Sequence, residues 1–130
     1  MKIKQFEIPG LAQYAYVVSS KGEAAVIDPM RDYERYLDYA ASESLKVRFV
    51  TETHIHADFA SGAVALAAAC RAELLLSGHE EDEKYRYSMP HRSLRDGDEF
   101  VVGKARLRAL HTPGHTPEHL SFVLFDEERD

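Results

Sequence analysis

One ten-residue segment carries the strongest signal in this sequence, and it reads Thr53-His54-Ile55-His56-Ala57-Asp58-Phe59-Ala60-Ser61-Gly62. It places two imidazoles and a carboxylate on alternate residues, His54, His56 and Asp58. Because alternate side chains of an extended segment leave the backbone in the same direction, these three can converge on one point. Neutral imidazole and carboxylate are ligands of zinc and of ferrous iron. We therefore interpret the segment as a metal-binding loop.

The rest of the sequence predicts alternating strands and helices around this loop. Strands are expected at residues 2–8, 14–19, 24–28, 46–53, 73–76, 100–102, 105–110 and 120–125. Helices are expected at residues 32–44, with Asp32 as the N-cap, and at 63–71. The strand at 46–53 delivers the histidine loop at its C-terminal end, where layered α/β proteins form their active sites. Asp28 follows a short apolar strand, and it is expected to be a distant ligand, a helix cap or an acceptor that braces the loop.

Length and composition restrict the classes of function. A chain of 130 residues with 45% hydrophobic residues is expected to form one soluble domain, residues 1–130. Its net charge of −6 argues against nucleic acid as a partner. It has one cysteine, which excludes an internal disulfide and a cysteine-rich metal site. The sequence shows neither a membrane-spanning segment nor a secretion signal, so we expect a cytoplasmic protein without a membrane partner.

Two motifs carry a resemblance to a known family. Thr53-His54-Ile55-His56-Ala57-Asp58 resembles the T-H-x-H-x-D signature of the metallo-β-lactamase fold, and His111-Thr112-Pro113-Gly114-His115-Thr116 resembles its P-G-H-T segment. With Ala25-Val26-Ile27-Asp28-Pro29, the resemblance follows the family's order through nearly the whole chain. The residues around the loop, Glu52-Thr53-His54 and Ala57-Asp58-Phe59-Ala60-Ser61-Gly62, are similar to the persulfide dioxygenase branch, especially to bacterial proteins that carry rhodanese domains.

The resemblance implies a fold class. It is α/β (α+β), the N-terminal half of a metallo-β-lactamase-type αβ/βα sandwich, with a mixed sheet and helices on one face. Because the family's complete fold is much longer, the chain is expected to be truncated before the second half, without the second sheet and its helices. That would leave apolar faces at residues 63–70 and 122–125 uncovered. We therefore expect self-association through these faces or low stability.

The resemblance also implies site residues. The metal ligands would be His54, His56, Asp58 and His115, and His56 and Asp58 would also handle protons. In the persulfide dioxygenases the iron is held by the residues that match His54 and His115 and by a later aspartate, which has no counterpart up to residue 130. Only one histidine of the Pro-Gly turn is needed as a ligand, so the neighbouring histidines at 111 and 119 are expected to line the pocket or support the ligands.

Phe59 limits the number of metals. The family's two-metal hydrolases use H-x-H-x-D-H, and here the last of these histidines is Phe59, which cannot ligate a metal. We therefore predict one metal per chain. Two histidines and a carboxylate suit Fe(II), the expected metal, whereas three histidines with an open position suit Zn(II) and hydrolysis.

Three functions remain open from the sequence. The first is a mononuclear non-haem iron enzyme that oxidises a low-molecular-weight thiol persulfide with dioxygen to sulfite and thiol, with a rhodanese domain as a partner in the full-length protein. The second is a metal-dependent thioester hydrolase similar to glyoxalase II, although those enzymes normally hold two metals. The third is a non-catalytic fragment or assembly module.

Overall fold

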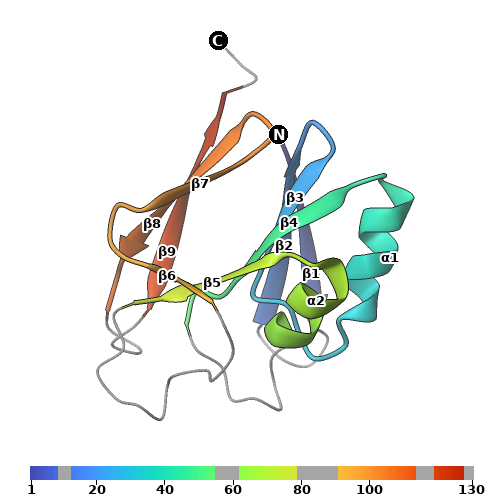
Figure 1. Cartoon of the computed structure of the whole chain (residues 1–130), viewed down its shortest axis with the longest axis horizontal. Coiled ribbons are helices and arrows are strands. Elements are labelled where there is room, and N and C mark those ends of the chain that lie inside the picture. Colours follow the sequence, from blue (N-terminus) through green and yellow to red (C-terminus); the bar gives the residue numbers. More distant parts are fainter. Residues whose placement is uncertain (9–12, 55–61, 79–90, 114–118, 128–130) are drawn as a thin grey trace.

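The described residues of the chain form two sheets and two helices (Figure 1). The computed structural model describes residues 1–8, 13–54, 62–78, 91–113 and 119–127. The larger sheet has the order β1-β2-β3-β4-β5-β6. Its strands are β1 (Lys2–Ile8), β2 (Gln13–Ser20), β3 (Glu23–Ile27), β4 (Lys46–Thr51), β5 (Glu73–Ser77) and β6 (Arg92–Leu94). The first three strands are antiparallel neighbours, and β3 to β6 run parallel, so the sheet is mixed as expected.

Both helices cover one face of this sheet (Figure 1). They are α1 (Glu34–Ser42) and α2 (Ala63–Cys70), which connect parallel strands β3 to β4 and β4 to β5. Residues of the central strands alternate between the two faces, which is why these strands are apolar throughout: Val17 and Val26 face the helices, whereas Val18 and Ile27 face away. The helices therefore complete one of two separate cores.

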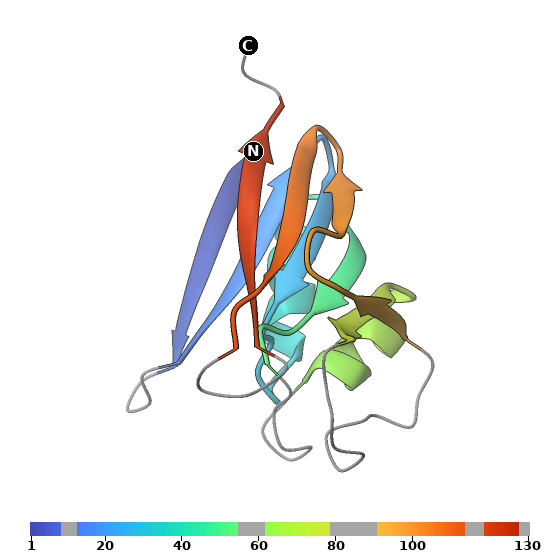
Figure 2. The same cartoon turned by 90° about the vertical axis from the view of Figure 1, so that its left-hand side faces the viewer.

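The second core lies between the two sheets, which lie side by side in Figure 1, whereas Figure 2 views the molecule from the side of the smaller sheet. The smaller sheet consists of β7 (Glu99–Val102), β8 (Ala105–His111) and β9 (Leu120–Asp126), all antiparallel. The expectation that the second sheet would be missing is therefore wrong: three of its strands are present, and Phe100, Leu107 and Leu120 are buried against the larger sheet. The hairpin pattern was visible in the sequence, but its position opposite the first sheet depends on contacts between distant residues.

Two expected apolar faces are only partly uncovered. On β9, Phe122 and Leu124 pack against the core between the sheets, and Phe125 lies under the guanidinium of Arg106 at 4.0 Å. On α2, Val64 remains 37% exposed, together with neighbouring alanines. Self-association through the outer face of α2 stays a prediction, for which sedimentation at several protein concentrations is the measurement.

Smaller differences concern element ends. The N-cap of α1 is Tyr33, without a side-chain capping bond, so the expected cap at Asp32 is wrong; Asp32 pairs instead with Arg35 at 3.0 Å. The sequence reading also missed β6, because three residues are too short for a periodic pattern. The described part of the chain contains no helix that is both long and apolar enough to cross a membrane.

The turns of two hairpins join the sheets. The carboxylate of Glu23 accepts a hydrogen bond from Gly103 N at 2.8 Å and pairs with Arg48 at 2.7 Å. Lys104 N donates to Ser20 Oγ at 3.0 Å. The main-chain donor of Gly103, followed by the charge of Arg48, lowers the pKa of Glu23. Deprotonated Glu23 therefore stabilises the contact between the β2–β3 and β7–β8 turns.

Glu23→Gln should reduce stability at neutral pH and lose its effect in acid. Because folding lowers the pKa of Glu23, its contribution is present above the unfolded value of about 4.3 and disappears as the pH falls through the folded value. The difference in Tm between wild type and Glu23→Gln should therefore be largest near neutral pH and vanish in strong acid. Glu7→Gln on β1 is the control. A difference in Tm that does not change with pH would contradict the expectation.

Candidate functional site

The candidate site forms where β3 and β4 end. These strands are parallel neighbours, with Ile27 opposite Thr51, so the residues that follow them meet. Asp28 N donates to Thr51 O at 2.9 Å, and Asp28 adopts φ +57°, a left-handed conformation. This turn directs the Asp28 side chain toward the start of the predicted metal loop.

Asp28 braces that loop. Its Oδ1 accepts from Thr53 N at 2.7 Å, and its Oδ2 accepts from Thr53 Oγ1, also at 2.7 Å. Among the three roles expected for Asp28, the structure supports that of the bracing acceptor. The cap of the next helix belongs to Tyr33. The Asp28 carboxylate thus holds the backbone of the residues that follow β4 in position.

His54 is the only one of the four predicted ligands that the structure describes; His56, Asp58 and His115 lie outside the described residues, as does Phe59. The Nδ1 atom of His54 lies 3.1 Å from Thr53 Oγ1. Its ring stacks on His119, with centroids 5.7 Å apart and planes 15° from parallel. The first histidine motif therefore meets, through this pair of rings, the residue that precedes β9.

The second motif is held by the antiparallel pair β8–β9. His111 ends β8 opposite Leu120, the first residue of β9. Between them, Thr112 N donates to His119 O at 2.9 Å, and Thr112 Oγ1 lies 3.0 Å from His119 Nδ1. Thr112 Oγ1 also contacts Ser121 Oγ at 2.9 Å. His119 thus contacts His54, and its expected role in supporting the ligands stays a prediction.

One main-chain bond connects the two sheets at this edge. Leu120 N donates to Thr53 O at 2.5 Å, which ties the start of β9 to the residue before His54. The bond brings together segments that are far apart in the sequence.

The far end of the loop is anchored to the same turn as its beginning. Gly62 N, directly before α2, donates to Pro29 O at 3.0 Å, and Met30 N donates to the hydroxyl of Tyr36 at 2.9 Å. Tyr36 is 1% exposed, and burial raises its pKa. Residues 28–30 therefore hold both ends of the loop, at Thr53 and at Gly62.

Sequence reasoning missed two residues here. Thr53 is the hydrogen-bonding centre of the site, although it was read only as part of a motif. Glu52 is 1% exposed despite its charge. The sequence does contain a signal for them, because Glu52 and Thr53 are two polar residues at the end of an apolar strand, directly before the histidines.

The donor chemistry around His54 suits a metal ligand. Metal-binding histidines usually use one ring nitrogen for the metal while the other is held by a neighbouring oxygen, often with a carboxylate behind it. Nδ1 of His54 is held in this way by Thr53, and Asp28 lies behind Thr53. The described residues alone bring together no group of three metal-ligating side chains.

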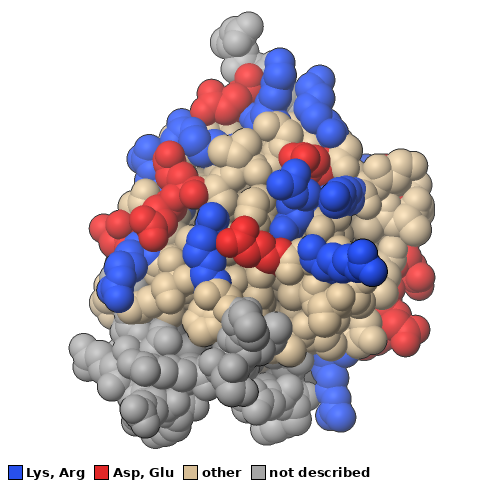
Figure 3. Space-filling view, viewed as in Figure 1, with Lys and Arg blue, Asp and Glu red and all other residues tan. Residues whose placement is uncertain are grey.

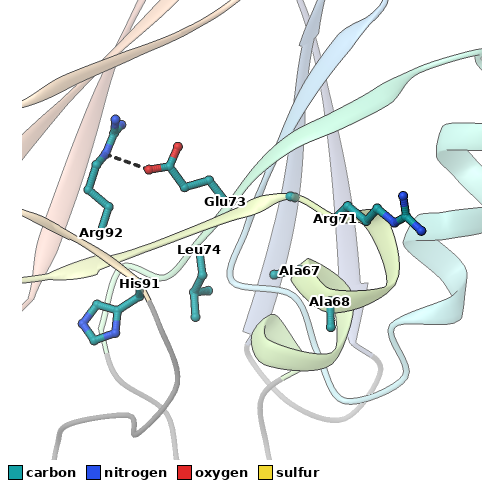
Figure 4. Close-up of a pocket in the computed structure, with 8 residues that line it drawn as sticks. Ala67, Ala68, Arg71, Glu73, Leu74, His91 and Arg92 are labelled. Carbon is teal, nitrogen blue, oxygen red and sulfur yellow. Dashed lines mark ion pairs between the residues drawn. The ribbon is translucent and has the colours of Figure 1, made fainter.

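A hollow of about 650 Å³ lies elsewhere, beside the end of α2 and the beginnings of β5 and β6 (Figure 4). His91 and Arg92 line it, and Arg92 pairs with Glu73 at 3.4 Å. Arg71 points away from these two residues (Figure 4). The hollow lies where strands β5 and β6 begin, and this separates it from Thr53 and His54, which follow the end of β4.

Charges of both signs are interspersed over the face of the molecule shown in Figure 3. In the smaller sheet, Glu99 lies between Arg108 and Arg106, and these two guanidinium groups lower the pKa of Glu99. The absence of a nucleic-acid partner, expected from the net charge, stays a prediction.

Comparison with known proteins identifies the family. Residues 8–128 match the Metallo-beta-lactamase superfamily. The chain belongs to this superfamily. Its structure superposes on a metallo-beta-lactamase from Staphylococcus aureus subsp. aureus COL with a TM-score of 0.90 and 42% identity, covering 98% of this chain and 39% of that one. ETHE1 from Myxococcus xanthus gives a TM-score of 0.83 and 29% identity, covering 95% of this chain and 54% of that one.

The chain is also similar to a curated hydrolase. A hydroxyacylglutathione hydrolase of Anaeromyxobacter dehalogenans is 37% identical over 109 residues, which are 83% of this chain and 40% of that protein. The chain spans about half, or less, of the curated relatives that it matches. The superfamily and its fold, predicted from the two histidine motifs, are confirmed.

Proposed function

We propose that this chain is part of a mononuclear non-haem iron enzyme that oxidises a low-molecular-weight thiol persulfide with dioxygen. The observation that carries the proposal is Phe59, which stands where the family's two-metal hydrolases have a ligating histidine. Similarity to the ETHE1 structure of Myxococcus xanthus supports this activity over the hydrolytic activities of other members of the superfamily.

The proposed reaction converts persulfide, dioxygen and water into thiol, sulfite and two protons. The bond between the two sulfur atoms breaks, the outer sulfur is oxidised, and dioxygen is reduced. Bound ferrous iron would supply the redox chemistry. His54, His56, Asp58 and His115 are the proposed ligands, and His56 and Asp58 are also proposed to handle the protons that the reaction releases. Thr53 and Asp28 hold His54 in place.

A second candidate is a thioester hydrolase that uses a metal-activated water. The 37% identity to a hydroxyacylglutathione hydrolase favours it. Phe59 counts against it, because one ligand of the second metal is then missing. A cytoplasmic location and a rhodanese partner remain predictions, for which fractionation and the full-length sequence are the tests.

Elemental analysis after anaerobic purification separates these functions. We expect about one iron per chain, and oxygen consumption with glutathione persulfide but not with a thioester. Zinc together with thioester cleavage would favour the second candidate. A chain without metal and without either activity would contradict both.

His54→Ala tests whether His54 is a ligand. This variant should strongly reduce the amount of bound metal, because one proposed ligand is removed. His91→Ala removes a histidine that lines the separate hollow, and it should leave the metal content unchanged. Equal metal content in wild type and His54→Ala would exclude His54 as a ligand.

A further inference from the structure

The hydroxyl of Thr53 lies between a carboxylate and an imidazole. Its Oγ1 is 2.7 Å from Asp28 Oδ2 and 3.1 Å from His54 Nδ1. The main-chain nitrogen of Thr53 donates to the other carboxylate oxygen, Oδ1, at 2.7 Å. Each of these three distances is short enough for a hydrogen bond. Which atom is the donor in each bond follows from the number of protons that each group carries.

A threonine hydroxyl has one proton to donate and two lone pairs that accept, whereas an ionised carboxylate only accepts. The proton of Thr53 Oγ1 therefore goes to Asp28. Toward His54, Oγ1 is left as an acceptor, so the ring nitrogen that faces it must carry a proton.

We infer that Asp28, acting through Thr53, holds His54 in the Nδ1–H tautomer and so leaves Nε2 unprotonated for the metal. A neutral imidazole can carry its proton on either nitrogen, and the hydrogen bond at one nitrogen decides which lone pair remains available. This inference rests on the proposed function for the identity of the metal site. It makes Asp28 and Thr53 positioning residues, because neither needs to touch the metal.

Two further contacts keep the His54 ring in this orientation. His119 covers its face, with the centroids 5.7 Å apart. Leu120 N donates to Thr53 O at 2.5 Å, which holds the backbone directly before the ring. Together with the bond at Nδ1, they restrict rotation of the ring, which adds to the selection of one tautomer.

Asp28→Asn should invert the tautomer. Thr53 N is a donor, so the carbonyl oxygen of the new amide stays opposite it and the amide nitrogen faces Oγ1. That nitrogen donates to Oγ1, whose own proton then turns to Nδ1 of His54. Asparagine tolerates the left-handed conformation of position 28, φ +57°, so the backbone can remain in place.

The test combines NMR with metal titration. In metal-free, 15N-histidine-labelled protein at about pH 8, where an ordinary imidazole is neutral, long-range 1H–15N spectra report which nitrogen is protonated. We expect Nδ1–H for His54 in wild type and in Thr53→Ser, and Nε2–H in Asp28→Asn. Titration with Zn²⁺ alone should show affinity about 10–100-fold weaker for Asp28→Asn and Thr53→Val.

Thr112→Val is the matched control. It removes the equivalent hydroxyl beside His119 and leaves Asp28 and Thr53 intact, so the His54 tautomer should not change. Nε2–H in the wild type, or an unchanged tautomer in Asp28→Asn, would overturn the inference. Because the NMR readout needs neither metal nor turnover, inactivity toward persulfide and thioester would refute the proposed function alone.

Discussion

Gly62→Ala should destabilise the fold by about 3 kcal/mol or more, out of a total of about 5–15 kcal/mol for a domain. The backbone conformation is not the reason, because Gly62 has φ −100°, which alanine can adopt. A Cβ atom at this position would lie 2.0 Å from Met30 O and 2.9 Å from Met30 C. Both are main-chain atoms, so the start of α2 would have to move away from the turn at residues 28–30.

Urea unfolding measures this effect. Gly78→Ala is the control, because its Cβ would meet the side chain of Ser93 at 3.1 Å, a milder contact that can relax. Since Gly62 anchors the end of the predicted metal loop, we also expect the amide resonance of Thr53 to shift in Gly62→Ala. A loss of stability no larger than that of Gly78→Ala would show that α2 does not depend on this close approach.

Gly103→Ala should reduce the free energy of unfolding by a similar amount. Gly103 lies at the other end of the molecule, and two separate causes contribute. Its φ of +55° costs an alanine about 1–2 kcal/mol. In addition, the Cβ would lie 2.2 Å from Ser20 O and 2.6 Å from Ser20 C, which adds about 1–3 kcal/mol. The bond from Gly103 N to Glu23 at 2.8 Å would be lost if the turns separated.

Gly97→Ala separates these two causes. Gly97 has φ +88°, and a Cβ there would meet nothing within 4 Å, so only the cost of the conformation applies. The difference in unfolding free energy between Gly103→Ala and Gly97→Ala then measures the contact between the two hairpin turns. Equal losses in the two variants would mean that the sheets do not depend on this contact.

Local patterns were sufficient for most elements. The alternation in β1, the apolar run of β3 and the hairpin around Gly103 appear where they were expected, because each depends on neighbouring residues. The predicted helix at 63–71 ends at Cys70, followed by Arg71 in a left-handed cap. The start of α1 was misplaced, because Asp32 forms an ion pair rather than the expected cap.

For the site, the sequence supplied residue types and a family resemblance but not the contacts. The spacing and the resemblance predict His54 as a ligand, and they allow three roles for Asp28. The bond from Thr53 to Asp28 decided between these roles, and it exists because β3 and β4 are parallel and in register at Ile27 and Thr51.

By itself, the sequence determined the family, the order of the elements other than β6, and the two histidine motifs, since each depends on residues that are close together along the chain. Only the tertiary structure decided that β7, β8 and β9 form a second sheet over the first, that His119 stacks on His54, and that Leu120 bonds to Thr53. These contacts join segments separated by much of the chain. They depend on the burial of two apolar surfaces against each other, which no local pattern specifies.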